Sequence, residues 1–159
     1  MIEKKYFSIE EIKRKLERYC AYQDRCHKEI ETKLKEFILI EEAKNQLLLH
    51  LMEHDFLNEE RFSKSFARGK FRIKKWGKQR IIRELKMRNI SEYNIKTALK
   101  EIDEAVYLTT IYEIAERRND IISETDMYKR KKKLSDYLIR KGYEYDLIFS
   151  TLKNILEKK

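Results

Sequence analysis

The residues of this sequence most able to bind another molecule are Lys and Arg side chains, which are concentrated in the stretch from Asp55 to Ile90. Between Arg61 and Arg88 there are twelve Lys or Arg residues and a single acid, Glu84. Such an imbalance indicates an anionic partner, because like charges held together repel one another until a negative group neutralises them. Eleven residues of the stretch, ten basic and one aromatic, are candidates for contacting that partner. They are Arg61, Lys64, Arg68, Lys70, Arg72, Lys74, Lys75, Trp76, Lys78, Arg80 and Arg83.

Trp76 is the one aromatic candidate, and it stands among Lys74, Lys75 and Lys78. It could stack on a base or anchor an interface, as aromatic side chains do in basic grooves. It could instead pack at the joint between two helices. We favour the packing role and keep the residue among the candidates.

Basic charge is distributed unevenly along the chain. The formal net charge is −1 over residues 1–57, +9 over residues 58–101 and +1 over residues 102–159. The whole excess therefore lies in the middle third. A second basic run, Lys129 to Lys133, either extends the first or lies in an exposed turn before Leu134, and the sequence leaves both possibilities open.

A metal-dependent reaction is the other chemistry to weigh. Residues 50–54, His-Leu-Met-Glu-His, match H-x-x-E-H, in which two histidines one helical turn apart hold zinc and the glutamate acts as a base. The match is short and no third ligand is identifiable. Leu47, Leu48 and Leu51 interleave with the histidines, so an ordinary helix face explains them better. We therefore expect no metal, no cofactor and no enzymatic activity.

The two cysteines, Cys20 and Cys26, are six residues apart, which fits no common zinc or redox spacing. They are interpreted as core or half-buried thiols. No apolar run opens the chain, and no segment approaches the ~20 apolar residues of a membrane span. A cytoplasmic protein without a membrane segment is expected.

The elements that position these residues are predicted to be helices. Three glycines, no proline and many Glu, Lys, Leu and Ile residues all favour helix. At 159 residues the chain fits one domain of ordinary size. An all-α fold is expected.

A recurring apolar spacing predicts how the helices are organised. Steps of four and then five residues occur three times, at a pitch of 51 and then 53 residues. The three sets are Ile30, Leu34 and Leu39; Ile81, Leu85 and Ile90; and Leu134, Leu138 and Tyr143. We predict three tandem three-helix repeats, at about 8–56, 57–102 and 103–157, stacked into an elongated, curved solenoid-like body.

Individual helices follow from caps and apolar stripes. Ser8 with Glu11 forms a capping box that starts the first helix. Helices of the second repeat are expected at about 59–73, 78–88 and 92–102, the first of them burying Phe62, Phe66 and Ile73. Its basic residues at positions 61, 64, 68, 72 and 75 then form a ridge beside the apolar side.

The third repeat is expected to begin with a helix lined by Ala105, Leu108 and Ile111. A polar connection over residues 117–126 follows. The next helix ends at Gly142, which is typical of a helix C-terminus. A last helix is expected over about 145–157.

Residues of the first and second repeats closely resemble the signature of the RecX family, regulatory proteins of the RecA recombinase. The resemblance covers essentially the whole chain and is strongest over 19–34 and 55–90. The residues that carry it are Tyr19 to Ile30 with Leu34, then Asn58 to Phe62, Phe66, Arg68, Lys70, Trp76, Gly77, Arg80, Ile81, Glu84, Leu85 and Arg88.

The resemblance implies a helical, non-enzymatic regulator of recombination in DNA repair and the SOS response. Proteins of this kind bind the RecA nucleoprotein filament in its groove, limit its growth, and suppress its ATPase, strand exchange and coprotease activities. A monomer with weaker affinity for single- or double-stranded DNA is expected. The alternative is a direct DNA-binding protein of the helix-turn-helix kind without a RecA partner, because three-helix units also build such modules.

Overall fold

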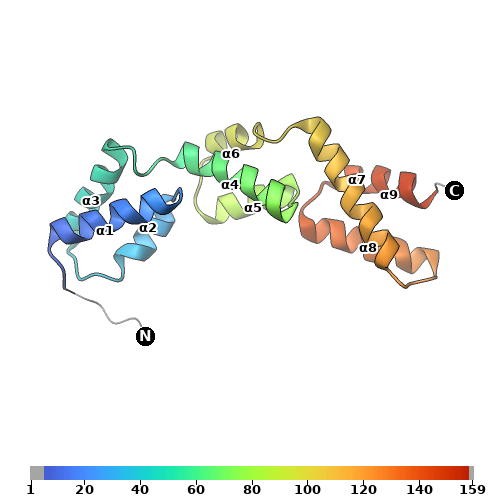
Figure 1. The fold of residues 1–159 in the computed structure, drawn as a ribbon, viewed down its shortest axis with the longest axis horizontal. Coiled ribbons are helices and arrows are strands. Elements are labelled where there is room, and N and C mark those ends of the chain that lie inside the picture. Colours follow the sequence, from blue (N-terminus) through green and yellow to red (C-terminus); the bar gives the residue numbers. More distant parts are fainter. Residues whose placement is uncertain (1–5, 158–159) are drawn as a thin grey trace. The chain divides into compact units, whose positions relative to one another are not determined.

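The computed structural model describes residues 6–157, which form nine helices and no β-strand (Figure 1). The first three are α1 (Ile9–Tyr22), α2 (His27–Leu34) and α3 (Glu41–Glu53). Then come α4 (Glu59–Lys74), α5 (Lys78–Met87), α6 (Glu92–Leu99), α7 (Glu104–Ile121), α8 (Met127–Lys141) and α9 (Tyr145–Leu156). The predicted all-α fold of three-helix repeats is confirmed. None of the described helices is both long and apolar enough to cross a membrane.

The chain divides into two compact units. One comprises Met1–Ser65 and Leu85–Thr97, and the other comprises Phe66–Glu84 and Ala98–Lys159. The boundaries between the units fall inside α4, α5 and α6. Residues of α4 before and after Ser65 therefore have their neighbours in different units.

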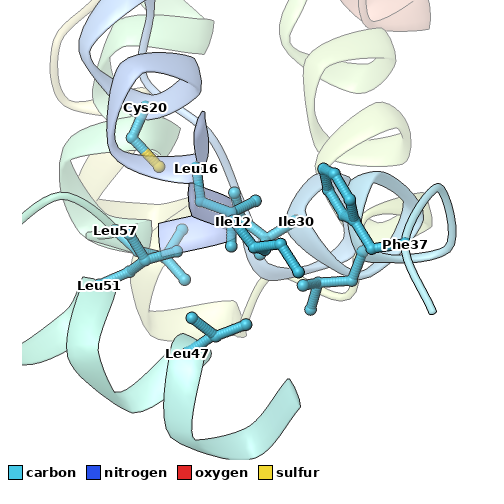
Figure 2. Close-up of a cluster of buried hydrophobic side chains, with 9 residues drawn as sticks. Ile12, Leu16, Cys20, Ile30, Phe37, Leu47, Leu51 and Leu57 are labelled. Atoms are coloured by element: carbon cyan, nitrogen blue, oxygen red, sulfur yellow. The ribbon is translucent and has the colours of Figure 1, made fainter. Parts of the chain in front are cut away.

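The first unit has an aliphatic core supplied by α1, α2 and α3 (Figure 2). Ile12, Leu16 and Cys20 come from α1 at helical spacing, and they meet Ile30 of α2 and Leu51 of α3. The N-terminus of α1 has the predicted capping box: the Glu11 amide donates to Ser8 Oγ, and the Ser8 amide donates to the Glu11 carboxylate. Local start signals and a buried stripe thus determine where α1 lies.

The second unit has its core where α7, α8 and α9 lie together (Figure 1). Tyr107, Ile111, Leu134, Leu138 and Leu152 are all no more than 1% exposed. The Tyr107 ring is tilted against those of Phe71 and Tyr143, at centroid distances of 5.7 and 5.3 Å. This aromatic group joins the end of α4 to α7 and to the turn between α8 and α9.

The five-residue step of the repeat pattern is a helix-ending motif. The Ile90 amide donates to the Leu85 carbonyl across Asn89, and the Tyr143 amide donates to the Leu138 carbonyl across Gly142. Asn89 and Gly142 both have a positive φ, of 58° and 101°, as the last turn of such a helix requires. No positive φ occurs between Leu34 and Leu39, so the first repeat ends its second helix differently.

The apolar stripe predicted for α4 is wrong in its second half. Ile73 is 75% exposed, whereas Ser63 and Ala67 are fully buried and Phe71 is 9% exposed. The buried positions after Phe62 follow steps of four residues, but two are small side chains that carry little hydrophobic signal. A prediction based on large apolar residues alone therefore placed the buried face of α4 wrongly.

Helix α7 of the third repeat differs from its prediction in its length and in its buried face. Helix α7 continues to Ile121, so half of the polar connection expected over 117–126 is helical. It buries Tyr107 and Ile114, while Leu108 is 45% exposed. Apolar residues occur on more than one side of α7, which makes its register ambiguous in the sequence. The run Lys129–Lys133 lies within α8 and not in a turn.

Candidate basic binding surface

The eleven candidate residues lie along α4, in the turn after it and in α5. Their side chains fall into two groups. Some are neutralised or packed by groups of the same protein, and others are exposed without such a partner. The distinction separates residues that hold the fold from residues available to an external anion.

Arg61 belongs to the first group. Its Nε donates to Asp24 Oδ1 at 2.8 Å and one terminal nitrogen donates to Asp55 Oδ2 at 3.0 Å. The other terminal nitrogen donates to the backbone carbonyls of Asp55 and Phe56. The hydrogen bond with Asp24 raises the pKa of Arg61 above its ordinary value. Arg61 therefore ties the start of α4 to the rest of the first unit.

Lys64 and Arg68 are also paired internally. Lys64 Nζ lies 3.6 Å from Glu60 Oε1, one turn earlier on α4. Arg68 donates to Glu101 Oε1 at 2.5 Å. With Arg61, three of the five ridge positions have carboxylate partners within the chain. The ridge is thus neutralised by the protein itself over its N-terminal part.

The turn that follows α4 is held through its backbone. Lys75 has a φ of 59°, and the Trp76 amide donates to the Lys70 carbonyl across it. Lys141 Nζ donates to the Lys74 carbonyl at 2.9 Å, and the Tyr143 hydroxyl donates to the Lys75 carbonyl at 2.8 Å. These bonds satisfy carbonyls that a helix end leaves open. The side chains of Lys74 and Lys75 are left exposed.

A reciprocal contact between Gly77 and Gly142 fixes the start of α5. The amides of Gly77 and Gln79 donate to the carbonyls of Lys141 and Gly142 at 2.7 and 2.9 Å. A Cβ on Gly77 would collide with the backbone of Gly142 and Tyr143, and one on Gly142 would collide with Arg80. The N-terminus of α5 thus meets the C-terminus of α8, an arrangement that pairs the positive end of one helix with the negative end of the other.

Trp76 is 9% exposed and packs edge-on against Phe66, with ring centroids 6.2 Å apart. Cations lie over its ring: Lys70 Nζ is 5.0 Å and the Arg80 guanidinium 4.2 Å from the centroid. Its burial supports the packing role over base stacking. Lys70 and Arg80 are only partly exposed, so Trp76 orients them beside the turn.

Lys78 is engaged at the first turn of α5. Its amide donates to the Tyr107 hydroxyl at 2.9 Å, and its Nζ lies 2.9 Å from Glu104 Oε2. The Tyr107 hydroxyl in turn donates to Glu144 Oε1. Burial, together with this bond to Glu144, raises the pKa of Tyr107 far above its ordinary value. Lys78 therefore belongs to the groups that join α5 to α7.

Four candidates remain exposed, and no side-chain partner for them occurs among residues 6–157. They are Arg72, Lys74, Lys75 and Arg83. All four lie within residues 72–83, which we call the basic segment. Because nothing in the described part of the chain neutralises them, these are the cations best able to bind an external anion.

The sequence prediction missed Lys141, which belongs to the same surface. Desolvation lowers its pKa, and the nearby charges of Arg80 and Lys74 lower it further. The backbone carbonyl of Arg140, the residue before Lys141, accepts a hydrogen bond from the Arg80 guanidinium at 3.2 Å. A signal was present, since two cations directly before a helix-ending glycine are typical of side chains near helix carbonyls.

The second basic run is largely engaged within the third repeat. Arg130 donates to the carbonyls of Asn119, Ile122 and Glu124 and to the Asn119 side chain. Lys132 pairs with Asp136, and Lys133 with Glu124. The guanidinium of Arg130 therefore holds the loop between α7 and α8.

The groups considered for metal chemistry have other contacts. His50 Nε2 lies 2.8 Å from Glu17 Oε2, which joins α3 to α1. Within residues 6–157 no group of three or more His, Cys, Asp or Glu side chains is arranged to hold a metal ion. Cys20 and Cys26 are buried, and burial raises the pKa of each thiol to about 11. Both are therefore protonated near neutral pH.

Comparison with known proteins places this surface in a named domain. Two family models match, described as RecX, second three-helix domain, over residues 58–99 and RecX, third three-helix domain, over residues 105–152. The basic segment lies inside the first match.

Similar proteins carry the same description. The regulatory protein RecX of Clostridium perfringens (strain 13) is 29% identical over 130 residues, which cover 80% of this chain and 60% of that protein. Regulatory protein RecX of Clostridium acetobutylicum is 31% identical over 135 residues, covering 82% and 62%. The chain thus spans less than two thirds of these relatives.

A solved structure shows the same fold. The crystal structure of RecX from Lactobacillus salivarius matches with a TM-score of 0.80 over 94% of this chain and 97% of that one, at 21% identity. At this identity the match concerns the fold alone. The helices that position the basic segment are therefore a shared architecture.

Proposed function

Because this chain belongs to the RecX family, we propose that it is a regulatory protein that binds the RecA nucleoprotein filament and inhibits its growth. Inhibition of the filament's ATPase, strand exchange and coprotease activities would follow from the same binding. The protein acts by occupying a surface and not by catalysis. One observation supports this most strongly: the basic segment holds four exposed, unneutralised cations on a backbone fixed by hydrogen bonds.

The rigidity of the basic segment matters for binding. Cations on a disordered tail must be ordered when they bind, which costs free energy. Here the backbone carbonyls of Lys74 and Lys75 are already held by Lys141 and Tyr143. The cations at 72–83 are thus presented in a fixed arrangement to the phosphates and carboxylates of a filament. Blockade then follows by steric exclusion or by locking the filament in one state.

The direct test follows the ATPase of RecA from the same organism on single-stranded DNA, with substoichiometric amounts of the protein added. We expect strong inhibition by the parent protein. The triple variant Arg72→Glu, Lys75→Glu, Arg83→Glu should need at least about tenfold more protein, because three attractive contacts become repulsive. Circular dichroism should show unchanged helicity.

A matched control carries the same change of charge elsewhere. Lys35, Lys96 and Lys100 are exposed, without a side-chain partner among the described residues, and lie outside the basic segment. Their triple reversal to Glu should retain inhibition. Absence of inhibition at any ratio of parent protein contradicts the proposed function. Equal loss in both triple variants contradicts only the assignment of the surface.

Salt dependence distinguishes the filament regulator from a protein that simply binds DNA. Pure phosphate binding through six to ten contacts loses about three to five decades of affinity between 50 and 200 mM salt. A mixed footprint on protein and DNA should lose less. Tight binding to naked duplex DNA with the steeper dependence, and no effect on RecA, would favour the direct DNA-binding alternative.

A further inference from the structure

A groove of about 400 Å³ opens between α8 and α9, outside the basic segment. Its apolar lining comes from Met127, Phe149, Leu152 and Leu156. Leu152 is 1% exposed and forms part of the core, whereas Met127 and Phe149 are 56% and 66% exposed. Large apolar side chains turned to solvent around a concavity are costly to leave uncovered, and they often mark a binding site.

Two lysines flank this apolar groove. Lys131 Nζ lies 4.8 Å from the centroid of the Phe149 ring, and Lys153 lies on α9 beside Leu152. Neither has a carboxylate partner among residues 6–157, although Lys132 and Lys133 next to Lys131 are both paired. The groove thus joins an apolar surface to two unneutralised cations.

We propose that this groove binds an acidic peptide segment that carries a bulky apolar anchor. The anchor would fill the space between Met127, Phe149 and Leu156, and carboxylates beside it would pair with Lys131 and Lys153. An anchor in an apolar pocket with charged groups at its edge is a common mode of peptide recognition. The inference does not rest on the proposed function, because the groove shares no residue with the basic segment.

Lining chemistry favours a peptide over single-stranded nucleic acid. Nucleic-acid strands bind on aromatic platforms with basic surroundings. Here the lining is mainly aliphatic, its one aromatic ring is already covered by Lys131, and the carboxylate of Glu157 stands at the edge. A peptide can present backbone amides to Glu157 and carboxylates to Lys131 and Lys153, whereas the backbone of a DNA strand presents phosphates and no hydrogen-bond donor.

The test uses fluorescence anisotropy with the full chain and labelled peptides. The probe is a peptide of about twelve residues, Asp and Glu around one Leu and one Phe a helical turn apart. A second peptide replaces the two apolar residues by Ser at equal charge. We expect saturable binding of the first below about 100 µM, and at least about tenfold weaker binding of the second.

Variants locate the binding site. Lys131→Glu with Lys153→Glu should weaken binding at least about tenfold, and Phe149→Ala about fivefold. Lys129→Glu with Lys96→Glu is the charge-matched control, because both lysines are exposed and lie outside the groove. It should change binding less than about twofold. The variants keep their fold, since none of these side chains is buried.

Three results would overturn the inference. One is no saturation up to about 1 mM peptide. Another is equal binding of the Ser peptide, which would show charge attraction without an anchor. The third is displacement of the labelled peptide by oligo(dT), together with binding of labelled oligo(dT) that Phe149→Ala weakens to the same extent. That result would assign the groove to single-stranded nucleic acid. None of these assays contains RecA, so their failure leaves the proposed function untouched.

Discussion

The two ends of α4 are held in different ways. At the N-terminal end, charged side chains make the contacts: Arg61 pairs with Asp24 and Asp55, and the Glu59 carboxylate accepts from the His27 amide. At the C-terminal end, main-chain groups make them: the carbonyls of Lys74 and Lys75 accept from Lys141 and Tyr143. Basic residues are frequent at both ends.

This difference shows that density of charge alone does not identify a binding surface. A guanidinium that holds four acceptors within its own unit has little left to offer a partner. A helix end fixed through its carbonyls leaves its lysine side chains outward. The first arrangement should govern stability, and the second should govern binding.

The largest expected effect breaks the backbone anchor at the C-terminal end. Gly77→Ala would place a Cβ against the backbone of Gly142 and Tyr143, which cannot move aside as a flexible side chain can. We expect the free energy of unfolding to fall by about 3 kcal/mol, measured by urea denaturation.

Gly69→Ala is the matched control for that change. A Cβ at Gly69 meets nothing within 4 Å, and the residue lies inside α4. Alanine there should stabilise by about 0.5–1 kcal/mol, as expected in a helix interior. Similar stability of the two variants would argue against the close contact at Gly77.

An intermediate effect is expected at the N-terminal end. Arg61→Ala removes several charge-assisted hydrogen bonds and leaves Asp24 without its partner, so we expect a loss of about 2 kcal/mol in unfolding free energy. Inhibition of RecA should persist at temperatures where the variant is folded. Arg72→Ala should show the opposite pattern, with stability within about 0.5 kcal/mol of the parent and weaker inhibition. If Arg61→Ala lost inhibition at unchanged stability, the contrast between the two ends would be wrong.

The smallest change that a substitution should cause concerns Cys20, whose thiol pKa is raised by burial and lowered to a lesser extent by Arg61. Burial raises the pKa of Cys20 and Cys26 from 9.0 to about 11, so at pH 8 they should react with a disulfide reagent about a hundredfold more slowly than in urea. The fold favours the protonated form. The stability that the fold gains from keeping these thiols protonated is fully present below pH 9 and is lost as the pH rises through 11.

Arg61→Ala should slow Cys20 slightly further, because Arg61 lowers the pKa of that thiol. Reaction rates measured by absorbance over pH 7–10 provide the test. Rapid reaction of both thiols in the native protein at pH 8 would contradict their burial.

Local signals predicted most of the fold. The capping box at Ser8 and the helix end at Gly142 are sequence-local, and each lies where predicted. The repeat spacing was legible because Leu85 to Ile90 and Leu138 to Tyr143 are the same helix-ending motif. The buried stripe of α4 could not be recognised in the same way, because two of its members, Ser63 and Ala67, have small side chains.

The candidate surface was predicted only as a set of charges. Neutralisation of Arg68 by Glu101 and of Arg61 by Asp24 joins residues more than 30 positions apart, and no local pattern reveals such pairs. Lys141 had a local signal in its place before Gly142, but its contact with the Lys74 carbonyl, 67 positions away, had none. Which cations stay free is a property of tertiary structure.

The hydrogen bonds that hold the turn after α4 also have a consequence for the order in which the protein folds during synthesis. The basic segment leaves the ribosome before α8, yet the turn after α4 receives hydrogen bonds from Lys141 and Tyr143, which are 67 and 68 residues further along the chain than their acceptors. Contacts of such long sequence separation close late in folding. A nascent chain truncated before α8 would carry every cation of the basic segment without the contacts that hold its turn. If the protein is the proposed inhibitor, that truncated chain should not inhibit the filament.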